Sequence, residues 1–222
     1  MKSFTPHIFA CSHLLSWPVA WISRGMALLP PQMQAEIRRY CRHEDRCRSL
    51  AGKLLLRYGL GCLGFSTDLA GWQHAGANGR PFLPQRPVFS ISHTGSLAIC
   101  GIAEPLIGVD AESVGELPLN DFSRVFTREE IQAMNAAQAP RTLFFTLWTR
   151  KEAVLKAMGT GFFFPPDEFN VLSSPVRIKD QSFYLHPLPT GAACIGYAAL
   201  ADETRPVYRV VDGEALFEPW KE

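Results

Sequence analysis

The stretch RTLFFTLWTRKEAVLKAM, residues 141–158, decides the fold of the second half of the chain. It is the longest segment with apolar residues at helical spacing, and Gly159 follows where a helix-ending glycine belongs. Trp148, Glu152 and Lys156 lie at i, i+4 and i+8, so they share one face of this helix. Glu152 and Lys156 at this spacing form an ordinary intrahelical ion pair, or they supply a carboxylate and an ammonium to a site.

Short strand patterns surround this helix. VFSISH (88–93) and LAICGIA (97–103), joined by a tight turn, predict a hairpin, and LIGVDAE (106–112) predicts the next strand. A second long helix is expected over residues 32–60. Each half thus contributes one long helix and short strands in similar order, which predicts an α+β fold with helices packed on small antiparallel sheets.

The charges divide the chain at Pro105. Residues 1–104 hold 11 Lys and Arg against 5 Asp and Glu, whereas residues 105–222 hold 11 against 16, so the halves carry +6 and −5. We expect two subdomains with these bounds, each too small to make a cleft alone. The net charge of +1 excludes a broad basic surface for nucleic acid, and the 47% hydrophobic content excludes disorder.

We expect no targeting or membrane segment in this chain. Its first 21 residues are apolar but interrupted by prolines and histidines, so they lack a signal-peptide core. No apolar run reaches the roughly 18 residues that a membrane span needs. The six scattered cysteines are expected to be reduced core thiols, and we expect a cytoplasmic protein.

Two acidic residues on a predicted strand are candidates for a metal site. Asp110 and Glu112 point to the same face, roughly 6–7 Å apart, and repel one another unless a cation lies between them. Such a pair is also found at solvated strand ends. With Glu152 as a third carboxylate, the set would suit Mg²⁺, and Lys156 could neutralise a phosphate oxygen beside it.

Two further residues are ambiguous on their own. His93 closes a strand beside Ser92 at a tight turn, where a histidine is often structural. Arg80 follows the turn residues Asn78 and Gly79, which would present its cation, although surface arginines on turns are common.

These pieces occur in an order that resembles the Sfp-type 4′-phosphopantetheinyl transferases. The resemblance covers about residues 31–171 and rests on four ordered motifs: GRP (79–81), FSISHT (89–94), IGVDAE (107–112) and WTRKEA (148–153) followed by Lys156. FTREE (126–130) and RSLAG (48–52) support it. The resemblance implies a pseudo-dimer of two similar α+β subdomains, with the ligand in the cleft between them.

The resemblance also implies a reaction. Enzymes of this family move the 4′-phosphopantetheine arm of coenzyme A to a serine of an apo acyl or peptidyl carrier protein, with Mg²⁺, and release adenosine 3′,5′-bisphosphate. Carried over by position, Asp110, Glu112 and Glu152 become the metal ligands. The residues expected to act on the reacting groups are Glu152, Lys156 and His93. Those expected to bind coenzyme A are Arg48, Ser49, Arg80, Ser92, His93, Lys151 and Lys156, with the role of Lys151 within its motif left open.

Some points stay open at this stage. Glu152 could accept the serine proton or could serve only as a ligand. Related enzymes often place lysines on the first helix for the adenylate 3′-phosphate, but Met33 and Glu36 stand there in this chain. Arg38, Arg39, Arg42 or Arg48 could replace those lysines.

Two alternative functions remain. One is a Mg²⁺-dependent hydrolase of coenzyme A or of a nucleotide, and the other is a non-catalytic binding module for coenzyme A or the carrier. No membrane or nucleic-acid partner is expected. Two unequal halves in one chain favour a monomer.

Overall fold

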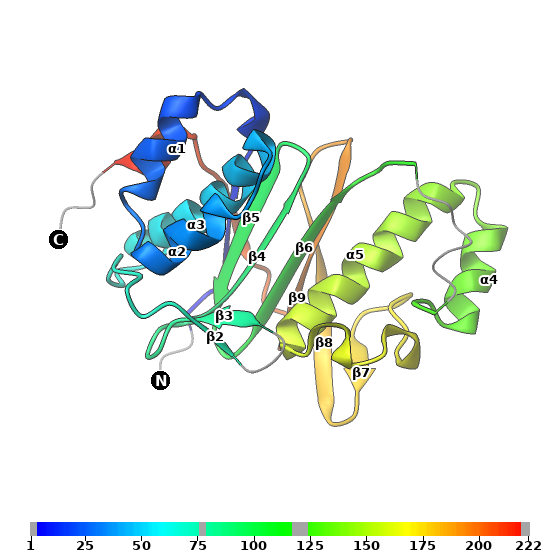
Figure 1. Cartoon of the computed structure of the whole chain (residues 1–222). Helices are drawn as coiled ribbons and strands as arrows, with labels where there is room; N and C mark the ends of the chain where they lie inside the picture. The colour runs from blue at the N-terminus through cyan, green and yellow to red at the C-terminus, as the bar shows by residue number, and fades with distance from the viewer. Residues whose placement is uncertain (1–3, 76–78, 117–123, 219–222) are drawn as a thin grey trace.

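Two four-stranded sheets, each with one long helix on its outer face, form the body of the protein (Figure 1). The computed structural model describes residues 4–75, 79–116 and 124–218. Helix α3 (His43–Cys62) covers the first sheet and α5 (Pro140–Met158) covers the second. The predicted α+β class is therefore confirmed.

The first sheet has the strand order β10-β1-β5-β4. Its strands are β1 (His7–Cys11), β4 (Val88–Thr94), β5 (Leu97–Ala103) and β10 (Val207–Val210). β1, β5 and β4 are antiparallel to their neighbours, whereas β10 runs parallel to β1. Two short helices, α1 (Val19–Met26) and α2 (Pro31–Arg38), lie beside α3, and a separate hairpin joins β2 (Gln73–Ala75) to β3 (Arg80–Phe82).

The single helix predicted over residues 32–60 is wrong, because two helices are observed there. α2 ends at Arg38 and α3 begins at His43. The intervening residues are polar or exposed, so they form a turn that lets Ile37 of α2 and Leu50 of α3 reach the same core. Glu44 in the first turn of α3 suits the positive end of its dipole.

The second sheet has the order β6-β9-β8-β7, all antiparallel. Its strands are β6 (Ile107–Ser113), β7 (Val176–Ile178), β8 (Gln181–Leu188) and β9 (Cys194–Leu200). Helix α4 (Arg128–Ala136) begins with the predicted capping box of Thr127 and Glu130. Gly159 ends α5 with φ +72°, as predicted.

Gly108 lets α5 approach β6 closely. A Cβ atom on this residue would lie 1.9 Å from the Ala153 carbonyl oxygen and 2.3 Å from the Ala157 nitrogen. No side chain fits at these distances. The glycine therefore brings the acidic strand and the Glu152 helix together.

The last strand crosses the predicted subdomain boundary. The boundary at Pro105 lies between β5 and β6, but β10 pairs with β1 of the first sheet. Beyond β10, Phe217 packs against Trp17 and Trp21. Residues 207–217 therefore belong with the first half, where they cover an edge that β1 would otherwise expose.

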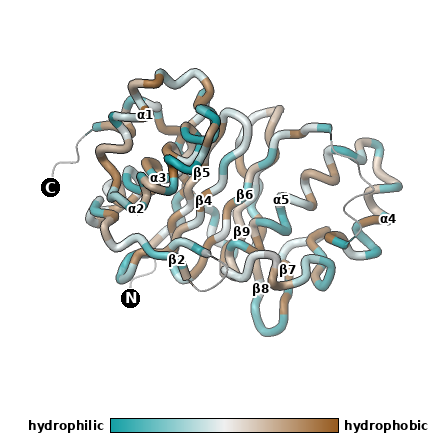
Figure 2. Tube along the Cα trace, viewed as in Figure 1, coloured by the Kyte–Doolittle hydropathy of each residue, from teal (hydrophilic) through white to brown (hydrophobic). Residues whose placement is uncertain are grey.

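Apolar side chains form three cores: under α3, under α5 and between the two sheets. Figure 2 shows the central strands largely in apolar colours and the turn between β7 and β8 in hydrophilic ones. Within the described ranges, no helix is long and apolar enough to cross a bilayer.

Candidate active site

The two halves meet along a seam between the edge strands β4 and β6, and this seam positions the site. The two strands belong to separate sheets, and side-chain hydroxyls of β4 accept hydrogen bonds from backbone N–H groups of β6. Val109 donates to Ser90 (3.0 Å), Ala111 to Ser92 (3.3 Å) and Ser113 to Thr94 (2.9 Å). Hydroxyls at every second residue of β4 thus replace the carbonyls of a normal ladder.

Asp110 is the centre of the site. Its side chain, 3% exposed, accepts hydrogen bonds on Oδ1 from Lys156 Nζ (2.7 Å) and Ser92 Oγ (2.8 Å). Its other oxygen, Oδ2, is buried and has no hydrogen-bond partner. A buried carboxylate oxygen without a donor is costly, so this atom calls for a further cation or donor.

The other two predicted carboxylates lie in the same electrostatic field. Burial raises the pKa of Glu112, and Asp110 raises it further, while Trp148 donates to Glu112 at 3.3 Å. Burial raises the pKa of Glu152 to about 7; Lys156 opposes this shift, and Asp110 and Glu112 add to it. Three carboxylates that disfavour each other's charge form a site suited to a cation.

The donor atoms of this site match Mg²⁺ in chemical type. The oxygens of three carboxylates, one of them without a partner, are the ligands that Mg²⁺ prefers. Across the described residues, however, no three His, Cys, Asp or Glu side chains converge closely enough to hold a metal. The Lys156 ammonium neutralises Asp110 in this arrangement, and its pKa is raised because Asp110, Glu152 and Glu112 outweigh the effect of its burial.

His93 and Arg48 line the first-half side of the seam. Desolvation of its ring lowers the pKa of His93, and three cations lower it further: Lys156, Arg48 and Lys53. Arg48 donates to the Gly95 carbonyl at 2.9 Å, which ties the start of α3 to the turn after β4. A neutral histidine among three cations is suited to receiving an anion.

Arg80 reaches across to the second half. Its Nη1 donates to the Ala157 carbonyl at 3.2 Å, while its Nη2 is buried without a hydrogen-bond partner. Gly159 leaves room for it, since a Cβ there would lie 2.8 Å from Arg80 Nη1. A cavity of about 220 Å³ opens at this place, with Ser90 and Lys156 among its lining residues from the two halves.

Comparison with known proteins identifies the family of the chain. The family model of the 4′-phosphopantetheinyl transferase superfamily matches residues 106–195, from β6 into β9. The chain is 30% identical over 178 residues to a 4′-phosphopantetheinyl transferase of Bacillus subtilis, an alignment that covers 76% of this chain and 75% of the relative. It is also 31% identical over 160 residues to the 4′-phosphopantetheinyl transferase Sfp of Bacillus subtilis strain 168, covering 67% and 68%.

The chain belongs to the 4′-phosphopantetheinyl transferase superfamily. As a member it is an enzyme that transfers a 4′-phosphopantetheinyl group.

Seven of the predicted site residues gather at the seam of this transferase. Asp110, Glu112, Glu152 and Lys156 come from the second half, and Ser92, His93 and Arg48 come from the first. The Ser92 hydroxyl is already used, since it donates to Asp110 and accepts from Ala111. It therefore acts on the carboxylate. Arg80 lies at the neighbouring cavity.

Lys151 requires a correction. Its side chain is 1% exposed, so the predicted contact with coenzyme A is not possible in this fold. Its three N–H groups bond to the carbonyls of Pro166 (2.7 Å) and Phe169 (2.6 Å) and to Glu130 (2.9 Å). Lys151 lies about 100° around the helix from Glu152, so it faces the core of the second half.

Lys53 is a residue that the sequence motifs did not single out. It lies one turn after Ser49 on α3, and its buried ammonium donates to Ser49 Oγ at 3.2 Å. Lys53 also pairs with Glu36 at 3.1 Å, whereas Met33 is buried in the core. Lys53 also lowers the pKa of His93, with a smaller effect than Lys156 or Arg48.

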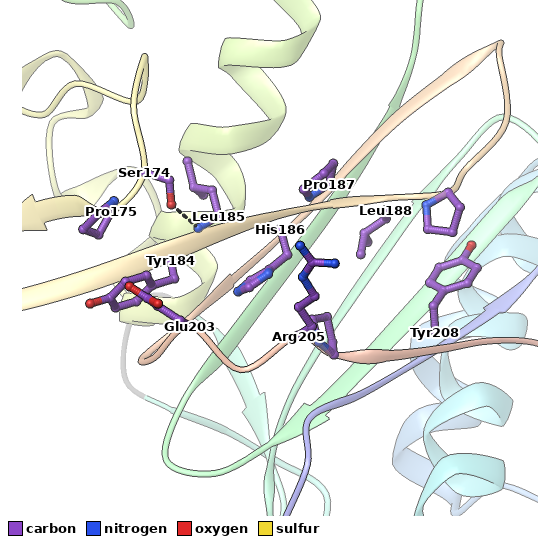
Figure 3. Close-up of a pocket in the computed structure, with 12 residues that line it drawn as sticks. Ser174, Pro175, Tyr184, Leu185, His186, Pro187, Leu188, Glu203, Arg205 and Tyr208 are labelled. Carbon is purple, nitrogen blue, oxygen red and sulfur yellow. Dashed lines mark hydrogen bonds between the residues drawn. The ribbon is translucent and has the colours of Figure 1, made fainter.

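A larger cavity, of about 630 Å³, lies elsewhere, between β8 and the segment before β10 (Figure 3). Its walls hold Tyr184, Tyr208 and several prolines, and Figure 3 shows Arg205 beside His186. It contains none of the predicted site residues. A choice of site by cavity volume alone would therefore miss the predicted site residues of this transferase.

Proposed function

We propose that this transferase moves the 4′-phosphopantetheine arm of coenzyme A to the serine hydroxyl of an apo acyl or peptidyl carrier protein, releasing adenosine 3′,5′-bisphosphate. The carrying observation is the seam between β4 and β6, where three carboxylates face a group of cations. Carboxylates suit a metal that binds a diphosphate, and the cations suit the remaining phosphate charge. Superfamily membership supports the reaction.

Asp110, Glu112 and Glu152 are proposed to hold Mg²⁺. Bound there, Mg²⁺ supplies Lewis-acid stabilisation of the charge that develops on the diphosphate. The unpartnered Asp110 Oδ2 and the raised pKa values of Glu112 and Glu152 support this assignment.

The cations of the site are proposed to bind and orient coenzyme A. Lys156, now paired with Asp110, would turn its ammonium to a phosphate oxygen once another cation neutralises the carboxylate. His93, Arg48 and Lys53 would form the positive side of the coenzyme site, with Arg80 at the adjoining cavity. Ser92 would keep Asp110 oriented through its hydrogen bond.

The bond changes are those of a phosphoryl-group transfer. The carrier serine oxygen forms a bond to the phosphorus that bears pantetheine, and the bond from that phosphorus to the bisphosphate leaving group breaks. The serine proton needs an acceptor. Glu152, with a pKa of about 7, suits that role, and it also suits the role of a ligand alone.

We further propose that the two halves form a pseudo-dimer, with a coenzyme side in residues 1–104 together with 207–217 and a metal side in residues 105–206. The matching topology supports it. Each half runs along the chain as strand, long helix, strand, strand: β1, α3, β4, β5 in the first half and β6, α5, β8, β9 in the second. In both sheets the last of these strands lies in the middle, which gives the orders β1-β5-β4 and β6-β9-β8. We propose a monomeric, cytoplasmic enzyme, in keeping with the free state of all six cysteines.

A transfer assay tests the function. The protein is incubated with coenzyme A, Mg²⁺ and a panel of apo carriers from fatty-acid, polyketide and peptide synthesis, and each carrier is weighed by mass spectrometry. We expect one carrier at least to gain a single phosphopantetheine. No gain on any carrier overturns the proposal, and bisphosphate release without a carrier would indicate the hydrolase instead.

A further inference from the structure

A polar cluster beside the site joins Lys53 to Glu36 and His74, two residues that have no role in the function proposed above. Glu36 of α2 accepts hydrogen bonds from Trp72 Nε1 (3.0 Å) and pairs with Lys53 of α3 (3.1 Å). His74 of β2 completes the cluster, with its Nε2 atom 2.8 Å from Glu36 Oε1. The other ring nitrogen of His74, Nδ1, lies 2.7 Å from the Gly79 carbonyl oxygen.

These distances favour the protonated form of His74. A neutral imidazole has only one N–H, but both ring nitrogens of His74 face oxygen acceptors. Trp72 Nε1 lies 3.2 Å from Nε2 as well, but its N–H already serves Glu36. An unprotonated Nε2 would leave two acceptors facing each other at 2.8 Å, so the imidazolium is the form that satisfies the cluster.

The surrounding charges agree with this assignment. The groups facing His74 are the Glu36 carboxylate from α2 and the Lys53 ammonium from α3. The pKa of His74 is raised by its hydrogen bonds to the Gly79 carbonyl and to Glu36, against burial and Lys53. Burial acts to raise the pKa of Glu36, but hydrogen bonds from His74 and Trp72 outweigh it, so that pKa is lowered.

The cluster is linked directly to Arg80. Gly79 precedes Arg80, and the β2–β3 register places Ala75 opposite Arg80 and His74 opposite Pro81. Through its two hydrogen bonds, His74 connects the α2 helix to the residue that leads into Arg80. Lys53 in turn connects the same carboxylate to Ser49.

We propose that protonated His74 is a positioning residue that, with Glu36, holds Arg80 in place for the phosphates of coenzyme A. The inference rests on the proposed function, since it takes Arg80 as a coenzyme ligand. Both hydrogen bonds exist while the ring is charged, and one is lost when it deprotonates. Coenzyme A affinity therefore falls as the pH rises through the raised pKa of His74.

Two measurements on the full chain test this proposal. NMR titration of the His74 ring proton gives its pKa without coenzyme A, and a value above the ordinary 6.5 is expected. Calorimetry gives the Kd for coenzyme A from about pH 6 to about pH 9 in wild type and His74→Gln. At low pH the variant should bind about fivefold more weakly, as for one lost hydrogen bond, and this ratio should approach one above the His74 pKa.

Two more variants separate this role from a structural one. Glu36→Gln should lower the His74 pKa and move the change in affinity to lower pH. In an Arg80→Ala background, His74→Gln should have no further effect on coenzyme A binding. His74 is 44% exposed, so its substitution should leave the fold intact.

The outcomes are distinguishable. A His74 pKa at or below 6.5, or a pH-independent ratio of the two Kd values, overturns the proposal. If His74→Gln weakens coenzyme A binding as much in the Arg80→Ala background as in wild type, the positioning role is overturned. If wild type binds no coenzyme A, the proposed function fails and the coenzyme role of His74 fails with it, while the NMR titration still decides whether the ring is charged.

Discussion

Ser92 and Asp110 form a buried hydrogen bond between the two halves of the protein. Ser92 Oγ donates to Asp110 Oδ1 at 2.8 Å and accepts from the Ala111 N–H at 3.3 Å. One hydroxyl therefore orients the central carboxylate and closes one rung of the seam between β4 and β6.

Replacing Ser92 with alanine removes both of these bonds. Because Asp110 and the Ala111 N–H are buried, we expect the free energy of unfolding to fall by about 1–3 kcal/mol and transfer activity to fall more than tenfold. Chemical denaturation and the carrier assay measure the two effects. Ser23→Ala, at an exposed position of α1, is the matched control and should change neither. An unaltered Ser92→Ala protein would contradict the role of the seam.

Gly108→Ala should push α5 away from β6. The added Cβ would meet the Ala153 carbonyl oxygen at 1.9 Å, and helix backbone cannot yield without moving the whole helix. We expect a loss of stability of about 3 kcal/mol or more and loss of transfer, because Glu152 would leave Asp110. Thermal unfolding measures the first effect. Gly115→Ala, where the nearest atom lies 3.9 Å away, should be neutral.

Lys151→Met tests whether this residue is structural. It would leave the Glu130 carboxylate buried without its cation, at an expected cost of about 3–5 kcal/mol in unfolding free energy. Coenzyme A affinity of the fraction that remains folded should stay at the wild-type value. Lys179→Met, on the surface, is the control. A stable Lys151→Met protein that binds coenzyme A weakly would contradict this structural role and would indicate that Lys151 contacts coenzyme A.

The carboxylates predict a pH dependence with a definite sign. The pKa of Glu152 is raised from its ordinary 4.5 to about 7. Between these two pH values the folded protein keeps a proton on Glu152 that the unfolded chain has released. Without metal, the free energy of unfolding should therefore fall as the pH rises from 4.5 to about 7. Glu152→Gln should make this fall smaller, and the remaining part comes from Glu112, whose pKa is also raised. A slope of the opposite sign in wild type would show that the folded state does not disfavour the charge.

Magnesium should restore the stability that the folded protein loses when Glu152 becomes charged. Above pH 7, where Glu152 is charged, added Mg²⁺ should raise the melting temperature of wild type by several degrees, because it binds the folded form. Glu152→Gln and Asp110→Asn should show little or no rise and should abolish transfer. An equal rise in all three proteins would refute the metal assignment.

Local patterns in the sequence predicted much of the local structure. The helix through Lys156, the capping box at Thr127, the glycine at 159 and the strand that carries Asp110 are all confirmed. Each depends on residues within one or two turns of each other, so spacing and propensity suffice. The single helix over residues 32–60 is wrong because the break before α3 serves a core shared with distant strands.

The sequence by itself determined the family and predicted the acidic and basic residues of the site, because both follow from residue types in a fixed order. Only the tertiary structure decided which of them meet. Ser92 and Asp110 are 18 residues apart, and Glu36 and His74 are 38 apart; no periodic pattern links such pairs. Likewise Lys151 and Glu152 are neighbours in one motif, but the helix turns one into the core and the other toward the seam.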